Sequence, residues 1–181
     1  DIALRKQYKV FLCNSDRNPE KEKMYIEVLA MERISGAVIA PYREENLVPL
    51  DKLAIPYVFI NQTLPGVKVD SVVLNNFKGA YEATMHLIEL GHTRIGVINS
   101  PNRPVETQRL IGYQKALLDS GIGIDPEIIV SGPFLVETAE KATDQLLALP
   151  APPTAVFSLN NTMTIGTLKS IAKPGLRLPG D

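Results

Sequence analysis

The sequence has few of the features that mark secreted, membrane-spanning or disulfide-stabilised proteins. Its 181 residues include one cysteine, Cys13, so no disulfide can form within the chain, which fits a reducing cytoplasm. Cys13 lies in an apolar, strand-like run, and this context predicts a buried structural thiol. The longest apolar runs, such as 57–60, are far too short to span a bilayer, and no charged-then-apolar leader opens the sequence. A cytoplasmic protein without a membrane segment is therefore expected.

Clustered positive charge and catalytic motifs are also missing. The chain has 19 basic and 20 acidic residues, a net charge of −1, and no dense Lys/Arg block. Binding of nucleic acid by counterion release requires such clusters, so the chain is not expected to bind DNA by itself. His86 and His92 have no Cys or second His at metal-ligand spacing, and G-x-S-x-G, P-loop and G-x-G-x-x-G motifs are absent. The sequence therefore predicts no metal, no cofactor and no catalytic residue, and an enzyme is the least favoured interpretation.

Short apolar runs alternate with helical patterns along the whole chain. This alternation is typical of an α/β protein built on parallel sheets. The predicted strands are 8–13, 37–40, 57–60, 71–74, 95–98, 128–130 and 155–159. The predicted helices are the tail at 1–7, a helix that begins at 19, a weaker one at 44–53, and those at 76–90, 105–120, 136–149 and 160–172.

The stretch 69–100 predicts a strand–helix–strand unit with two parallel strands and a right-handed crossover. Gly91 sits where the helix should stop in the left-handed conformation. The predicted buried face of this helix carries Ala80, Ala83, Leu87 and Leu90.

An earlier helix has a strong start signal. Asn18-Pro19 supplies a capping side chain and a proline at the first helical position. Its apolar face is predicted to carry Met24, Val28 and Met31.

Five motifs, in a constant order and spacing, resemble the effector-binding core of lactose-repressor-type (LacI/GalR) transcription factors. They are FLCNSDRNPEKEKMYIEVLAMERISGAVIAP, HLIELGHTRIGVI, RLIGYQKAL, PPTAVFSLNNTMTIGTL and GLRLPGD. The resemblance implies two Rossmann-like subdomains of the type I periplasmic-binding-protein fold, residues 1–75 and 76–181, with a small ligand between them. By the same comparison the fold is incomplete at both ends: the first strand, the elements after 181 and the helix-turn-helix headpiece are not in this chain.

The resemblance also implies five ligand-binding positions: Arg109, Asn160, Phe134, Asn61 and Arg103. Arg109 heads RLIG, where its guanidinium would bind sugar hydroxyls, a carboxylate or a phosphate, and the alternative is an ion pair with Glu106. Asn160 follows a strand and either contacts the ligand or only caps the next helix.

The remaining three positions have equally plain structural alternatives. Phe134 matches an aromatic residue that packs on ligand rings, or it packs in the core. Asn61 stands where relatives often have Asp, which puts a strict sugar-like contact in doubt. Arg103 matches a second ligand arginine of purine-type repressors, or it is a surface side chain. Asn75 and Asn161, also at positions where the family often has Asp, are expected to cap helices.

The expected function is that of an effector-sensing domain of a bacterial transcriptional regulator. Its ligand would be a sugar, a sugar phosphate or a purine-like molecule, and it would act as a homodimer on operator DNA through the headpiece that this chain lacks. A periplasmic solute-binding protein for sugar uptake is the alternative, since it shares the fold. A signal peptide ahead of Asp1 would indicate the transporter, and a helix-turn-helix would indicate the regulator.

Overall fold

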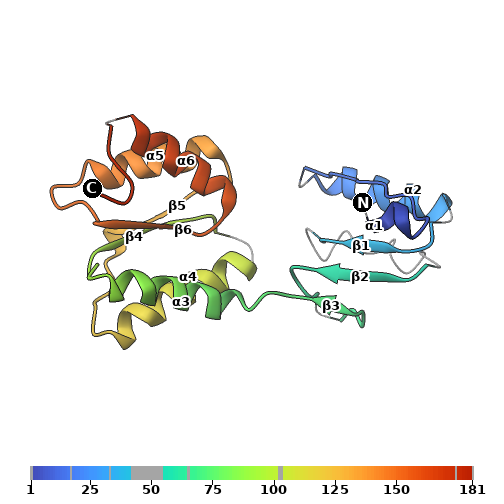
Figure 1. The fold of residues 1–181 in the computed structure, drawn as a ribbon, viewed down its shortest axis with the longest axis horizontal. Coiled ribbons are helices and arrows are strands. Elements are labelled where there is room, and N and C mark those ends of the chain that lie inside the picture. The colour runs from blue at the N-terminus through green and yellow to red at the C-terminus, as the bar shows by residue number, and fades with distance from the viewer. Residues whose placement is uncertain are drawn as a thin grey trace. The chain divides into compact units, whose positions relative to one another are not determined.

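The computed structural model describes residues 2–16, 18–32, 34–41, 55–64, 66–101, 104–173 and 175–180. It divides into two compact units, residues 1–74 and 75–181, which Figure 1 shows with their helices and strands labelled. Among the described helices, none combines the length and the hydropathy that a bilayer span requires.

The first unit contains a three-stranded parallel sheet in the order β1-β2-β3. Its elements are α1 Ile2–Arg5, α2 Pro19–Met31, β1 Ala37–Ile39, β2 Tyr57–Ile60 and β3 Ser71–Val72. The small core joins Ile26 of α2 to Phe59 of β2, both fully buried. The predicted helix 44–53 lies outside the described residues.

Helix α2 begins as predicted but buries a different face. The Asn18 side chain accepts hydrogen bonds from the backbone N–H groups of Glu20 and Lys21, and Pro19 occupies the first turn. The predicted apolar face was wrong, because Met24, Val28 and Met31 are exposed. The sequence also carries a second stripe, spaced by three and four residues, and that one packs on the sheet: it consists of Glu22, Ile26 and Leu29.

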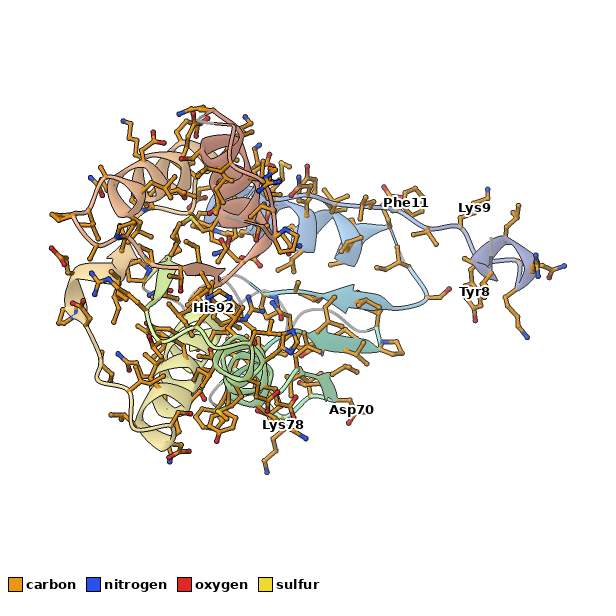
Figure 2. All side chains as sticks on the ribbon, turned by 60° about the vertical axis from the view of Figure 1, so that its left-hand side comes forward. Tyr8, Lys9, Phe11, Asp70, Lys78 and His92 are labelled. Carbon is orange, nitrogen blue, oxygen red and sulfur yellow. The ribbon has the colours of Figure 1, made fainter. Side chains whose placement is uncertain are left out.

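The predicted strand at 8–13 is not formed. These residues run as an extended segment after α1, along which Figure 2 labels Tyr8 and Phe11. Phe11 is 73% exposed and Leu12 93%, and Cys13 is exposed as well, which corrects the prediction of a buried thiol. A strand exists only as a member of a ladder, and no described strand pairs with this segment, so its β propensity has no partner to act on.

The second unit is a parallel sheet in the order β5-β4-β6 with helices on both faces. Its elements are α3 Asn76–Glu89, β4 Ile95–Asn99, α4 Pro104–Asp119, the 3-10 turn Pro126–Ile128, β5 Ile129–Ser131, α5 Val136–Leu147, β6 Ala155–Ser158 and α6 Asn161–Ala172. The central strand β4 is buried on both sides: Val97 packs with Tyr113 of α4, and Ile98 packs with Leu146 of α5 and Met163 of α6. A strand with helices on both faces is a continuous apolar run, as the sequence predicted for 95–98.

The predicted strand–helix–strand unit at 69–100 was wrong in its pairing. β3 belongs to the first sheet and β4 to the second, so the two strands never become neighbours. Helix α3 does form, and Gly91 ends it at φ 93° as predicted. Its buried side chains are Ala80 and Thr84, however, whereas Ala83 and Leu90 are exposed.

The helices of the second unit pack in two close pairs, and a glycine makes each close approach possible. A Cβ atom at Gly112 of α4 would lie 2.3 Å from the carbonyl oxygen of Phe77 on α3. At Gly166 of α6 it would lie 2.2 Å from the carbonyl oxygen of Val136 on α5. The spacing of both pairs is therefore set by backbone contact rather than by adjustable side chains.

Candidate functional site

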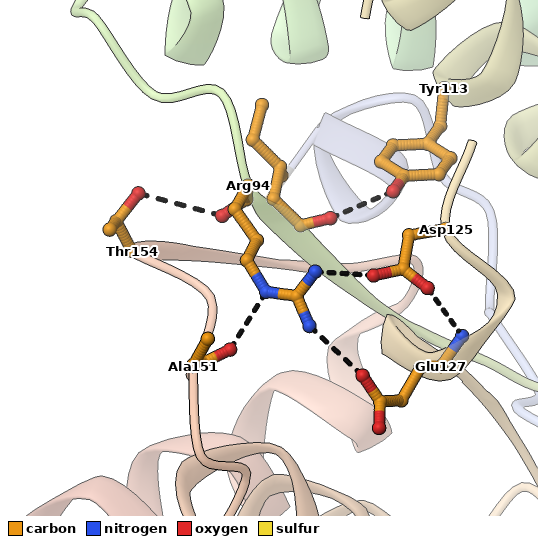
Figure 3. A network of polar contacts seen from close by, with 7 residues as sticks. Arg94, Tyr113, Asp125, Glu127, Ala151 and Thr154 are labelled. Carbon is orange, nitrogen blue, oxygen red and sulfur yellow. Dashed lines mark hydrogen bonds and ion pairs between the residues drawn. The ribbon is translucent and has the colours of Figure 1, made fainter. Parts of the chain in front are cut away.

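The amino ends of the strands in the second unit are tied together by Arg94 (Figure 3). Its Nε donates to the carbonyl of Ala151 at 2.7 Å, and its two terminal nitrogens pair with Asp125 and, at 3.2 Å, with Glu127. The backbone N–H of Glu127 and the Arg94 guanidinium hold the pKa of Asp125 below its ordinary value. This network fixes the loops that lead into β5 and β6, so the amino edge of the sheet is closed by internal partners.

The buried Tyr113 adds to the same edge. Its hydroxyl donates to the carbonyl of Ile95 at 2.7 Å, at the start of β4. Burial, helped by the charge of Asp125, raises the pKa of Tyr113 to about 12, so it stays a neutral donor. His92 has a comparable structural role, since its Nδ1 lies 2.9 Å from the Thr154 hydroxyl.

The carboxyl ends of the same strands carry buried polar side chains. Asn99 ends β4 and is 3% exposed, and Asn160 follows β6 at 9%. Among the described residues, the Asn99 Oδ1 and the Asn160 Nδ2 atoms have no hydrogen-bond partner. In open α/β sheets, ligands bind beyond this edge, where loops meet helix starts. The Ser158 Oγ, at the last residue of β6, is a third such atom. These unsatisfied polar atoms at the strand ends make this edge the candidate site.

The amide oxygen and the amide nitrogen of Asn160 can serve different functions. Its Oδ1 accepts a hydrogen bond of 2.9 Å from the backbone N–H of Met163, which caps α6. The cap is therefore Asn160, and Asn161, the predicted cap, is the first helical residue. Capping uses only the oxygen, so the amide nitrogen is left for another acceptor.

Arg109 reaches this edge from α4. Its Nε donates to Asn76 Oδ1 at 2.9 Å, and its Nη1 donates to the carbonyl oxygen of Leu159 at 2.6 Å. The guanidinium thus joins the first turn of α3 to the residue before Asn160. Arg109 and Asn160 are the two predicted site residues that the structure brings together.

The structure describes two of the other three predicted positions. Phe134 lies beyond the end of β5 and is half-buried. Asn61 follows β2 in the first unit with φ 73°, and its backbone N–H donates to Val72 at 2.8 Å. Arg103 lies outside the described residues.

Asn76 and Asn99 were missed from the sequence as site residues. Asn76 was interpreted as part of a turn and cap, and the cap proves to be Asn75, which accepts from the backbone N–H of Lys78 at 2.9 Å. Asn99 was placed in the loop after the strand 95–98. The sequence feature that could have identified Asn99 is its place as a polar residue directly after an apolar run, at the carboxyl end of the central strand. Within the described ranges, no group of His, Cys, Asp and Glu could hold a metal ion.

Comparison with known proteins gives a consistent set of matches. A family profile described as periplasmic binding proteins and sugar binding domain of LacI family matches residues 2–181. The HTH-type transcriptional repressor PurR of Haemophilus influenzae (strain PittEE) is 32% identical over 180 residues, 98% of this chain and 54% of the relative. PurR of Vibrio atlanticus (strain LGP32) is 34% identical over 181 residues, with the same shares. The chain thus spans about half the length of the curated relatives that it matches.

Solved structures agree with these sequence matches. The transcription regulator CcpA of Lactococcus lactis superposes with a TM-score of 0.84 at 27% identity, over 100% of this chain and 67% of that one. A sugar-binding transcriptional regulator of the LacI family from Escherichia coli, solved in complex with phosphate, superposes with a TM-score of 0.75 at 25% identity, over 99% and 66%.

Proposed function

The chain belongs to the family of periplasmic binding proteins and LacI-type sugar-binding domains, and on that premise we propose that it is the effector-sensing core of a bacterial transcriptional regulator. Membership confirms the predicted family and the predicted α/β fold class of the type I periplasmic-binding-protein kind. PurR is named as a transcriptional repressor and CcpA as a transcription regulator, which favours a regulator over a solute-binding protein for sugar uptake. As a regulator it would work in the cytoplasm as a homodimer and act on operator DNA through a helix-turn-helix headpiece.

The observation that carries this proposal is the contrast between the two edges of the second sheet. At the amino edge, Arg94 and Tyr113 donate to carbonyl and carboxylate oxygens of the protein itself. At the carboxyl edge, the Asn99 oxygen and the Asn160 nitrogen are buried without partners in the described part of the chain. Leaving a buried polar group unsatisfied costs about 1–3 kcal/mol, so water or a bound ligand is expected to supply the missing partners at this edge.

The type of ligand follows from the donors and acceptors at this edge. The Asn160 Nδ2 and the unused N–H groups of Arg109 donate, so they suit oxygen atoms of a sugar, a phosphate or a purine carbonyl. The Asn99 Oδ1 accepts, so it needs a hydroxyl or an N–H group on the ligand. A ligand with donors as well as acceptors fits this set better than a bare anion. Phe134, Asn61 and Arg103 remain further proposed contacts.

Isothermal titration calorimetry with a fixed panel tests the proposal. The panel is D-ribose, ribose 5-phosphate, hypoxanthine, guanine and inorganic phosphate. The informative variant is Asn160→Asp, because a carboxylate still caps α6 and keeps the fold, whereas the amide donor is lost. We expect binding of at least one probe, and a loss of about tenfold in affinity in the variant, since one hydrogen bond to a ligand is worth about 1 kcal/mol and the lone pairs of the ligand oxygen now face a carboxylate, which has no proton to donate. Equal affinity in the variant and the parent would reject this site.

A further inference from the structure

Asn76 holds the Arg109 side chain from a different helix. The two residues lie on α3 and α4, and the bond from Arg109 Nε to Asn76 Oδ1 is 2.9 Å. The second bond, from Nη1 to the Leu159 carbonyl, is 2.6 Å and reaches the end of β6. A guanidinium is a rigid planar fork, so two bonds from neighbouring nitrogens fix its plane as well as its position.

The helix spacing that this bond requires is built into the backbone. Gly112 lies one turn after Arg109 on α4, and a Cβ atom there would be 2.3 Å from the carbonyl oxygen of Phe77, the residue after Asn76. The contact would also bring it within 3.1 Å of the Ala80 side chain. Because the backbones of α3 and α4 are in contact at Gly112, the Arg109 side chain is long enough to reach Asn76 in the first turn of α3.

We propose that Asn76 is a positioning residue for the effector site: its side-chain oxygen orients the Arg109 guanidinium, and thereby its remaining N–H groups, toward the ligand at the carboxyl edge. This inference rests on the function proposed above and adds to it a residue that acts through Arg109. The first turn of α3 directly follows the boundary between the units at residues 74 and 75. The oxygen that accepts the Arg109 bond therefore belongs to the second residue of the second unit.

Two substitutions at Asn76 separate positioning from folding. Asn76→Asp keeps an oxygen acceptor for Arg109 Nε, and a negative charge in the first turn of a helix is favourable. Asn76→Leu has a similar volume but no acceptor. We expect the Asp variant to bind the responsive probe of the panel within about twofold of the parent, and the Leu variant to bind it about five- to tenfold more weakly, the effect of losing a hydrogen bond of ordinary strength.

The neighbouring Asn75 supplies the matched control. It caps α3 through Lys78 and makes no bond of this kind to Arg109. Asn75→Ala should therefore lower the melting temperature while leaving the affinity of the folded protein within about twofold, because caps contribute to helix stability. Asn76→Leu should show the opposite pattern, with a large change in affinity and a small change in melting temperature.

A double-mutant cycle completes the test. Arg109→Lys removes the planar guanidinium that Asn76 orients. If the two residues act as a unit, adding Asn76→Leu to Arg109→Lys should therefore have no further effect on ligand affinity. Additive effects, or an Asn76→Leu variant that binds as well as the parent, would overturn the inference and leave the proposed function standing. A parent chain that binds none of the probes would refute both.

Discussion

The close approach of α3 and α4 at Gly112 allows a sharp test of the helix packing that positions Arg109. In Gly112→Ala the new methyl group would be placed 2.3 Å from the carbonyl oxygen of Phe77 and 3.0 Å from the backbone nitrogen of Tyr81. Backbone atoms cannot step aside as a side chain can, so the helices must separate, and overpacking of this kind costs about 1–3 kcal/mol. The higher helix propensity of alanine opposes this by about 0.5–1 kcal/mol.

Gly79 on α3 is the control that isolates the steric penalty. It lies in the same helix pair, and a Cβ atom added there meets no atom within 4 Å. Gly79→Ala should therefore gain the propensity term alone and stabilise the protein by about 0.5–1 kcal/mol. The difference between the two variants then gives the cost of contact at Gly112, expected at about 1–3 kcal/mol.

Urea denaturation of both variants, followed by far-UV circular dichroism, provides the measurement. We expect a lower midpoint than the parent for Gly112→Ala and a higher one for Gly79→Ala, with unchanged slopes. A Gly112→Ala protein as stable as Gly79→Ala would show that α4 can move away from α3 without cost. Backbone contact at Gly112 would then not be what holds Arg109 within reach of Asn76.

Two further predictions concern the closed amino edge. Tyr113→Phe removes the hydroxyl that donates to Ile95, and we expect a loss of about 0.5–1.5 kcal/mol in unfolding free energy by denaturant titration; an unchanged midpoint would contradict it. Asp125 has a depressed pKa in the folded state, so its contribution is present above the unfolded pKa of about 4 and disappears as the pH falls through the folded value. Asp125→Asn should therefore flatten the fall in stability between about pH 5 and pH 3. A thermal melting series with the parent's acid sensitivity would show that the contacts of Asp125 with the Glu127 N–H and with Arg94 are not its source.

Local signals in the sequence predicted most of the elements because their causes are local. Asn18-Pro19 starts α2, Gly91 ends α3, and the β-branched and aromatic run 57–60 is a strand with unchanged bounds. The cap and the left-handed glycine need no distant partner. The run of β formers does need ladder partners, and it has them in β1 and β3. The alternation of strand and helix patterns along the chain was likewise enough to predict the α/β fold class.

The errors all concern contacts that only the tertiary structure decides. The segment 8–13 has the composition of a strand but no described ladder partner. Helix α2 carries two stripes of helical spacing, one of Met24, Val28 and Met31 and one in which Ile26 and Leu29 are joined by the charged Glu22. Periodicity favours the fully apolar stripe, whereas the other one meets the sheet. The stretch 69–100 has the length of a crossover unit, yet its two strands join different sheets. For the same reason Asn76 was not recognised, since its partner Arg109 lies 33 residues away.

The two edges of the second sheet also make a physical link between stability and ligand binding. Two buried atoms without partners, on Asn99 and Asn160, each cost about 1–3 kcal/mol relative to a satisfied group. The bonds of Arg94 and Tyr113 at the opposite edge do not depend on any ligand. A molecule that satisfies both atoms removes this penalty only in the folded state, and its binding therefore stabilises the fold in proportion to the logarithm of its concentration above Kd. Under the proposed function, these two polar groups are the ones through which an effector would act on the protein.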